Sequence, residues 1–95
     1  MSKPRDVDFN PVKELDLSEA RLVVRREFRR FGKPVTVIQG LPITRLREIA
    51  SELKRQLGAG GTTKNGVLQL QGDHRSRVRD RLVELGFPAD HMGLI

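Results

Sequence analysis

The stretch that most constrains the fold runs from Gly58 to Arg75, because its pattern is that of a strand hairpin held between two helices. Asn65-Gly66 near its centre is the dipeptide that best accepts the positive φ angles of a two-residue hairpin turn. After this turn, Leu68 and Leu70 alternate with glutamines, as a strand with one buried face requires. A glycine on either side of the hairpin then predicts that one helix ends before it and another begins after it.

Two amphipathic helices are predicted around this hairpin. The first begins after the turn 40–43, with Thr44 as its expected N-cap, and ends at Gly58. Glu48 and Glu52 are expected on its exposed surface. Its apolar stripe has helical spacing and consists of Leu46, Ile49, Ala50, Leu53 and Leu57. The second helix is predicted from about His74 to Leu85, with Asp73 as its N-cap and an inner stripe of Val78, Leu82 and Leu85.

Three further segments have strand character. Leu22, Val24 and Phe28 share one face of a first strand, residues 35–38 form a second, and residues 91–95 form a short last one. The order strand, strand, helix, strand, strand, helix, strand predicts an α+β fold. In it, both helices cover one face of a mainly antiparallel sheet of four to five strands, giving a two-layer sandwich.

The chain is expected to form one domain, residues 21–95, preceded by residues 1–20 as a mobile or loosely docked tail. The tail carries scattered acids, two prolines and no sustained periodicity. Two alternatives stay open for it. Phe9 and Leu15 could pack on the sheet, or the acidic side chains could shield a basic face.

Two ordered motifs on the central stretch resemble the translation initiation factor 1 family, which includes the eukaryotic start-codon-selection factor and its archaeal and bacterial relatives. Lys64-Asn65-Gly66, after Gly60-Gly61-Thr62-Thr63, matches the family's Lys-Asp/Asn-Gly turn. Gln71-Gly72-Asp73 with Arg75 matches its Gln-Gly-Asp-x-Arg motif, and residues 35–40 resemble the strand before its first helix. The resemblance covers about residues 21–95 and implies the same two-layer arrangement.

The charge of the chain is unevenly distributed. The whole sequence carries a formal charge of +6, but 15 of its 18 Lys and Arg residues and 7 of its 12 Asp and Glu residues lie in residues 21–95, which gives that part +8. Most of these cations are arginine, which pairs with phosphate in a bidentate manner. A compact domain of this charge is suited to binding a polyanion such as nucleic acid. The composition by itself is explained equally well by an ordinary solvated surface that is rich in cations.

The cations form several candidate contacts with RNA. Six basic residues and one acid fall from Arg21 to Lys33, and the resemblance implies that the basic loop in this position lies against ribosomal RNA, with Arg29, Arg30 and Lys33 as its best matches. A solvated hairpin whose arginines prevent edge-to-edge aggregation is the alternative. Two further candidate cations, Lys54 and Arg55, lie in the last turn of the first helix. Their position is explained equally well by the helix dipole, which favours positive charge at a helix C-terminus. The full set of candidate RNA-binding residues is Arg25, Arg26, Arg29, Arg30, Lys33, Lys54, Arg55, Lys64, Arg75 and Arg79.

Aromatic recognition of bases is not expected from this sequence. All four aromatic residues are phenylalanine, too few for the stacking platform of RNA-recognition sheets. Phe31 stands beside the basic cluster, but a phenylalanine there more often folds back onto apolar neighbours than stacks on a base. Recognition by shape and phosphate contacts is therefore predicted.

The sequence contains no pattern for catalysis or metal binding. Cysteine is absent, and His74 and His91 lack the partners of a catalytic unit. Residues 58–61 are glycine-rich but lack the ending of a phosphate-binding loop. We therefore expect a monomer that is not an enzyme, binds no metal or cofactor, has no membrane segment and resides in the cytoplasm.

The resemblance implies binding to the small ribosomal subunit near the decoding site, with ribosomal RNA, initiator tRNA and mRNA as partners. Initiator tRNA paired at a wrong start codon would there be destabilised or rejected. The tip at Lys64 would point toward tRNA or mRNA, although the family's longer hairpins reach farther. The alternative is a general RNA-binding module acting in stress response or translational repression.

Overall fold

The computed structural model describes residues 10–12 and 14–95, and these fold in the predicted order of elements. The first three long elements are β1 (Leu22–Phe28), β2 (Pro34–Gln39) and α1 (Leu46–Leu57). The remaining four are β3 (Gly61–Lys64), β4 (Val67–Gln71), α2 (Arg75–Leu85) and β5 (Met92–Leu94). Short 3-10 turns at Arg30–Gly32, Ile43–Arg45 and Ala89–His91 connect them.

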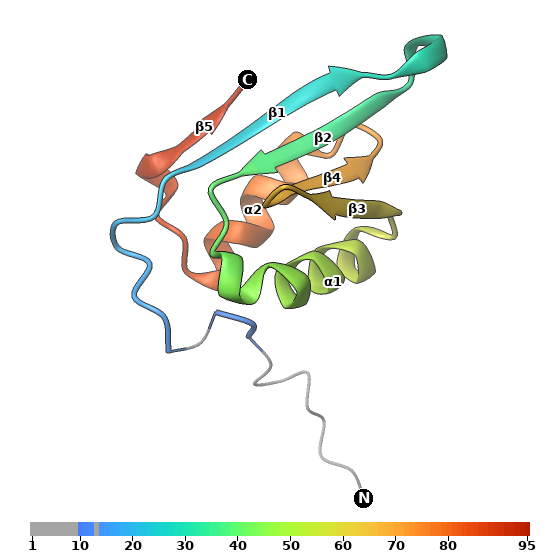
Figure 1. Ribbon diagram of the computed structural model, residues 1–95. Helices are drawn as coiled ribbons and strands as arrows, with labels where there is room; N and C mark the ends of the chain where they lie inside the picture. Colours follow the sequence, from blue (N-terminus) through green and yellow to red (C-terminus); the bar gives the residue numbers. More distant parts are fainter. Residues whose placement is uncertain (1–9, 13) are drawn as a thin grey trace, which may run out of the picture.

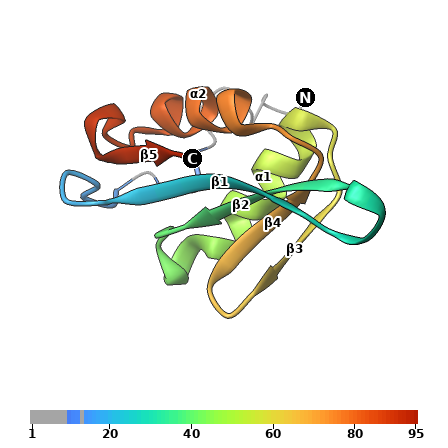
Figure 2. The same ribbon diagram turned by 90° about the horizontal axis from the view of Figure 1, so that it is seen from above.

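The strands form one mixed sheet in the order β3-β4-β2-β1-β5. Neighbouring strands are antiparallel except β5, which runs parallel to β1. Both helices cover the same face of this sheet, as Figure 1 and the view from above in Figure 2 show. The predicted α+β, two-layer, mainly antiparallel arrangement is confirmed.

The hydrophobic core lies between the sheet and the two helices. β1, β2 and β4 contribute fully buried side chains, among them Val24, Ile38 and Leu70. The helices contribute most of their predicted stripes, and their buried members are Ile49, Ala50, Leu53, Leu57, Val78 and Leu82. The other two predicted stripe residues, Leu46 and Leu85, are partly buried and pack against this core. Burial of these side chains fixes which face each element turns inward, since it removes the most apolar surface from water.

Helix α1 departs from the sequence prediction in two details. Thr44 is not its N-cap, because residues 43–45 form a 3-10 turn that leads into the helix without a side-chain cap. Glu52 is not on the exposed surface but only 7% exposed. Its carboxylate accepts a hydrogen bond from Arg55 at 2.6 Å and another from Gln56. The predicted end of the helix is confirmed, since Gly58 adopts the left-handed conformation with φ 63°.

The β1–β2 hairpin extends beyond the part of the sheet that the helices cover (Figure 1). Leu22 and Val24 are buried under α2, but Phe28, on the same face of β1, is 59% exposed. The prediction that these three residues share one face of the strand is therefore correct. The core, however, covers only the first part of that face and does not reach Phe28. The loop is closed by the Arg29 N–H, which donates to the Lys33 carbonyl oxygen at 2.7 Å.

The described part of the N-terminal segment lies against the core. Val12 is 2% exposed, and Leu15 and Leu17 pack on the core from outside. The Asn10 side-chain amide donates to the Leu85 carbonyl at 3.3 Å. Phe9, the other side chain considered for packing, lies outside the described residues, and the domain boundary at residue 20 stays a prediction. None of the described helices is long and apolar enough to cross a membrane.

Candidate nucleic-acid interface

Strand directions bring three basic segments to one end of the molecule. β1 runs toward the hairpin loop and β2 away from it, while β4 is antiparallel to β2 and so ends near the start of β2, where the Gly72 N–H donates to the Pro34 carbonyl at 3.0 Å. α2 starts at this same end. α1 finishes there too, because Gly60, just after it, accepts a hydrogen bond from the Gln71 N–H at 2.8 Å. We call this the hairpin end: loop 29–33, the last turn of α1 and the first turn of α2.

The hairpin loop presents its side chains to solvent. Arg30 and Lys33 are exposed, and neither has an ion-pair partner among the described residues. Phe31 between them is 91% exposed, so the prediction that it folds back onto apolar neighbours is wrong. The reason is local, since this loop extends past the part of the sheet that the helices cover (Figure 1).

Arg25 and Arg29 belong to a polar network on the uncovered face of the sheet. Arg25 donates to Glu27 at 2.7 Å and also bonds the side chain of Gln39. Arg29 donates to Glu27 at 3.3 Å and to Gln69 at 2.6 Å. Two valines on this face, at positions 35 and 37, are buried outside the main core, and the strand register places them directly opposite Glu27 and Arg25.

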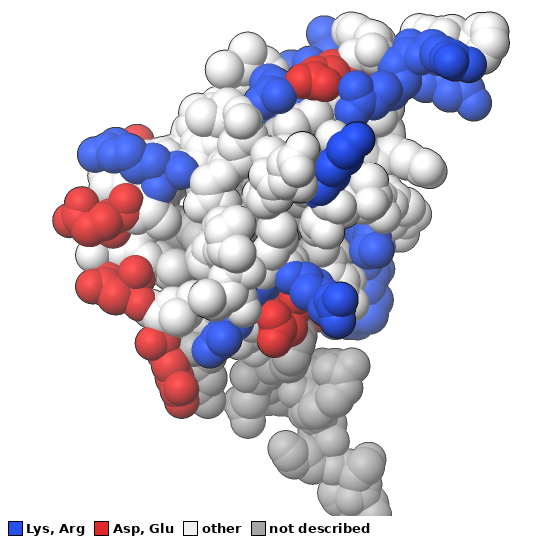
Figure 3. Space-filling view, in the orientation of Figure 1, with Lys and Arg blue, Asp and Glu red and all other residues white. Residues whose placement is uncertain are grey.

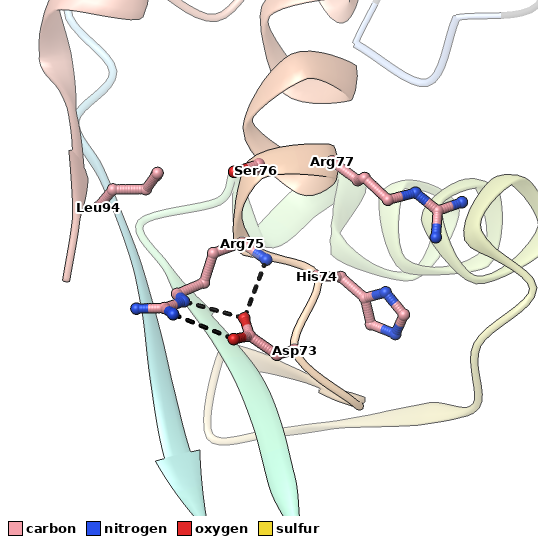
Figure 4. A pocket seen from close by; sticks show the side chains of 6 residues that line it. All are labelled: Asp73, His74, Arg75, Ser76, Arg77 and Leu94. Carbon is pink, nitrogen blue, oxygen red and sulfur yellow. Dashed lines mark hydrogen bonds and ion pairs between the residues drawn. The ribbon is translucent and has the colours of Figure 1, made fainter.

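The carboxylate of Asp73 binds two candidate arginines. Arg75 donates to it through Nε at 2.9 Å and through a terminal nitrogen at 3.0 Å (Figure 4), and Arg26 approaches it at 3.3 Å. Hydrogen bonding by Arg75, reinforced by its charge and by Arg26, lowers the pKa of Asp73 from 3.8 to about 2. The Arg26 guanidinium also lies 4.9 Å from the centre of the Phe28 ring. Both arginines therefore have partners within the fold.

Asp73 is not the N-cap of α2, although it does bind the start of the helix. The N-cap position is His74, and the Asp73 carboxylate accepts the Arg75 N–H at 3.4 Å. A shallow hollow of about 570 Å³ opens at this point, lined by residues 73–77 and Leu94 (Figure 4). Asp73 and Arg75 hold each other at one side of it, while the His74 and Arg77 side chains point away from this pair.

A buried hydroxyl that sequence reasoning missed fixes the start of α2. Thr36 in β2 is fully buried, donates to the Gly72 carbonyl at 2.7 Å and accepts the His74 N–H at 2.8 Å. Gly72 has φ +97°, and a Cβ there would lie 2.6 Å from the His74 ring. The motif around Gly72 therefore shapes the chain between strand and helix. The sequence pattern of β2 could not predict the contacts of the Thr36 hydroxyl, because its partners, Gly72 and His74, belong to a distant segment of the chain.

Of the remaining candidates, Lys54 and Arg55 lie in the last turn of α1, at the hairpin end. Arg55 is bound to Glu52 at 2.6 Å. Arg79 lies one turn into α2, 3.9 Å from Asp80. Lys64 lies apart from all of these, at the other end of the sheet. It precedes the Asn65-Gly66 turn, whose residues have φ 55° and 79°, as the sequence predicted.

Charge is unevenly distributed over the visible face of the molecule. In the space-filling view, Lys and Arg side chains crowd the projecting hairpin at the upper right, and acidic side chains gather along the opposite, left edge (Figure 3). Further basic side chains lie beside these acids and at the lower centre. The segment before β1 supplies exposed acids at positions 14, 16 and 19. On this face, acidic atoms also lie among the basic side chains at the base of the hairpin, while the acids of the left edge lie away from it.

Comparison with known proteins gives consistent matches over most of the chain. A family model described as translation initiation factor SUI1 matches residues 18–88. The chain is 46% identical over 84 residues to the protein translation factor SUI1 homolog of Sulfolobus acidocaldarius, covering 86% of this chain and 85% of that protein. It is 48% identical over 84 residues to the homolog of Aeropyrum pernix, with coverage of 86% and 83%. It is 48% identical over 77 residues to that of Pyrococcus furiosus, covering 79% of each chain.

Proposed function

The chain belongs to the translation initiation factor SUI1 family, and we propose that it acts in initiation by binding the small ribosomal subunit with its hairpin end. The observation that carries this proposal is the gathering of three basic segments at that end, namely loop 29–33, the last turn of α1 and the first turn of α2. Phosphate contacts dominate the affinity of proteins for nucleic acid, and clustered Lys and Arg side chains supply them.

The candidate residues divide into two roles in this proposal. Arg30 and Lys33 are exposed on a projecting loop and contact ribosomal RNA phosphates directly. Arg25, Arg26, Arg29 and Arg75 are held by Glu27, Asp73 and glutamines, which fixes their guanidinium groups at defined positions before binding. Lys54, Arg55 and Arg79 add positive charge at or near the same end. We further propose that residues 21–95 form the initiation-factor domain, with the preceding residues as an attached tail.

The finer part of the proposal is an effect on start-codon selection near the decoding site. No covalent step is required, because a protein that binds one of two ribosomal states more tightly shifts their populations by its difference in affinity. Lys64 stands on a stiff two-residue turn at the other end of the sheet from the loop. When the hairpin end binds ribosomal RNA, Lys64 lies at the opposite end of the sheet, where it contacts initiator tRNA or mRNA in this proposal.

Sedimentation with purified small subunits at several salt concentrations tests the proposal. Replacing both Arg30 and Lys33 by alanine should weaken binding and make the slope of log affinity against log salt shallower by about 2, one for each lost phosphate contact. Arg21→Ala combined with Arg47→Ala removes the same charge from the other end of β1 and the start of α1, and should leave the slope unchanged. Equal effects of the two double variants would contradict the proposal.

A general RNA-binding module remains the alternative. It predicts that the wild-type protein binds any RNA duplex as tightly as it binds the subunit at equal salt, whereas the proposed function predicts clear preference for the subunit. Competition of unlabelled duplex RNA against subunit-bound protein distinguishes the two.

A further inference from the structure

Phe31 is the most exposed large apolar side chain among the described residues. Its ring is 91% exposed and makes no ring contact with any of them. Phe28, lower on the same hairpin, differs in that the Arg26 guanidinium already lies over its ring. An apolar ring left uncovered at the tip of a charged loop contributes almost nothing to the hydrophobic core, so core packing does not account for it.

The backbone at Phe31 is also in an unfavourable conformation. Its φ of 61° and ψ of 26° lie in the left-handed region, where a bulky residue is rare. The loop enforces this geometry through the bond between Arg29 and Lys33 and through the Gly32 N–H, which donates to the Arg29 carbonyl at 3.1 Å. A strained residue without compensating packing is an observation that points to function. Here the hydrogen-bonded loop maintains a backbone conformation that leaves the Phe31 side chain exposed.

The residues next to Phe31 in the loop have the chemistry that binds the phosphates of a nucleotide. Arg30 and Lys33 stand on either side of Phe31 in the chain, both exposed, and loop 29–33 contains no acid. The nearest acid in sequence, Glu27, is already bound to Arg25 and Arg29. An aromatic face flanked by cations is the arrangement by which proteins bind single-stranded nucleic acid, with the base on the ring and phosphates on the cations.

We propose that Phe31 stacks on an unpaired base of the small-subunit RNA while Arg30 and Lys33 hold phosphates next to it. The proposal rests on the proposed function and adds direct contact with a base to the phosphate contacts of the hairpin end. It differs from the sequence-based prediction, in which recognition used shape and phosphate alone. A cation-flanked aromatic ring could equally enter an anionic membrane, so vesicles form one arm of the test.

An affinity series on purified small subunits tests the stacking. Phe31→Ala should raise Kd about 5- to 150-fold, the range that corresponds to the loss of one base–aromatic stack. The salt slope should not change, because no charge is lost. Phe31→Leu keeps apolar bulk without a π face and should lose nearly as much, whereas Phe31→Tyr should stay within about 3-fold of wild type. An unchanged Kd for Phe31→Ala, or full affinity of Phe31→Leu, overturns the proposal.

Fluorescence gives a second readout, because the chain contains no tryptophan or tyrosine. Phe31→Trp should be quenched when subunits are added and become protected from acrylamide. Phe28→Trp, a probe on the same hairpin, should change much less. A Phe31→Trp protein that sediments with subunits but remains unquenched overturns the stacking and leaves the proposed function standing. Wild-type protein that does not sediment with subunits overturns both.

The vesicle arm uses phosphatidylglycerol–phosphatidylcholine vesicles at physiological ionic strength. The emission of Phe31→Trp should be unaffected by them. A blue shift with vesicles, together with no change on subunits, would assign the ring to a lipid surface and overturn base stacking.

Discussion

At the scale of single residues, the structure separates side chains that stabilise the fold from side chains that are left for a partner. Asp73, Thr36 and Gly72 serve the junction of β4 and α2. In contrast, the side chains of Phe31, Arg30 and Lys33 make no hydrogen bond, ion pair or ring contact with the described part of the chain. Substitutions in the two groups should therefore affect different measurements. Stability responds to the first group, and binding to the second.

Phe31→Asn should stabilise the protein by about 1 kcal/mol. Asparagine adopts the left-handed conformation far more readily than phenylalanine, and a ring that is 91% exposed gives up little burial. Chemical denaturation measures the change. Phe28→Asn is the matched control: it lies in the extended strand β1 and loses its contact with Arg26, so it should not stabilise. A less stable Phe31→Asn protein would show that the ring packs within the fold.

Asp73→Asn should destabilise the protein at neutral pH by up to about 1 kcal/mol, since the carboxylate is partly solvated and its ion pairs are screened. The folded-state pKa of about 2 lies below the usual 3.8, so this contribution is present above about pH 4 and is lost as the pH falls through about 2. The difference between wild type and Asp73→Asn in urea unfolding should therefore shrink between pH 4 and pH 2. A difference that is independent of pH would contradict the assignment.

At the scale of elements, the sequence correctly predicted the turns, helix ends and buried faces that depend on neighbouring residues in the chain. Asn65-Gly66 gave the turn with two positive φ angles, Gly58 ended α1, and the leucines of α1 and β4 marked the inward faces. The prediction failed where a distant element supplies the deciding contact. Thr36 reaches α2 across 38 residues of sequence, and Phe31 lacks a partner because its hairpin extends past the helix layer.

The β3–β4 hairpin carries a prediction of its own. Lys64→Glu should leave binding to empty small subunits nearly unchanged, because Lys64 is at the other end of the sheet from loop 29–33. Its effect should appear only with initiator tRNA, as altered discrimination between correct and near-correct start codons at matched subunit occupancy. Equal discrimination by Lys64→Glu and wild type would remove Lys64 from the mechanism.

At the scale of the whole molecule, the sequence predicted a basic domain but not where its charge gathers. The candidate cations are spread from position 25 to position 79. Only the strand order, with β2 between β1 and β4, shows that the hairpin loop, the end of α1 and the start of α2 share one end while Lys64 lies at the other. The position of these three basic segments at one end, with Lys64 at the other, is the basis of the proposed orientation on the subunit.

Tethered cleavage of ribosomal RNA tests this orientation most directly, because the chain has no cysteine and a single one can be introduced anywhere. Ser76→Cys at the start of α2 and Ser18→Cys before β1 are equally conservative changes at exposed positions on opposite ends. With an iron chelate attached and the protein bound to small subunits, Ser76→Cys should cut the RNA strongly and Ser18→Cys weakly or not at all. Strong cleavage from Ser18→Cys, with none from Ser76→Cys, would contradict the account.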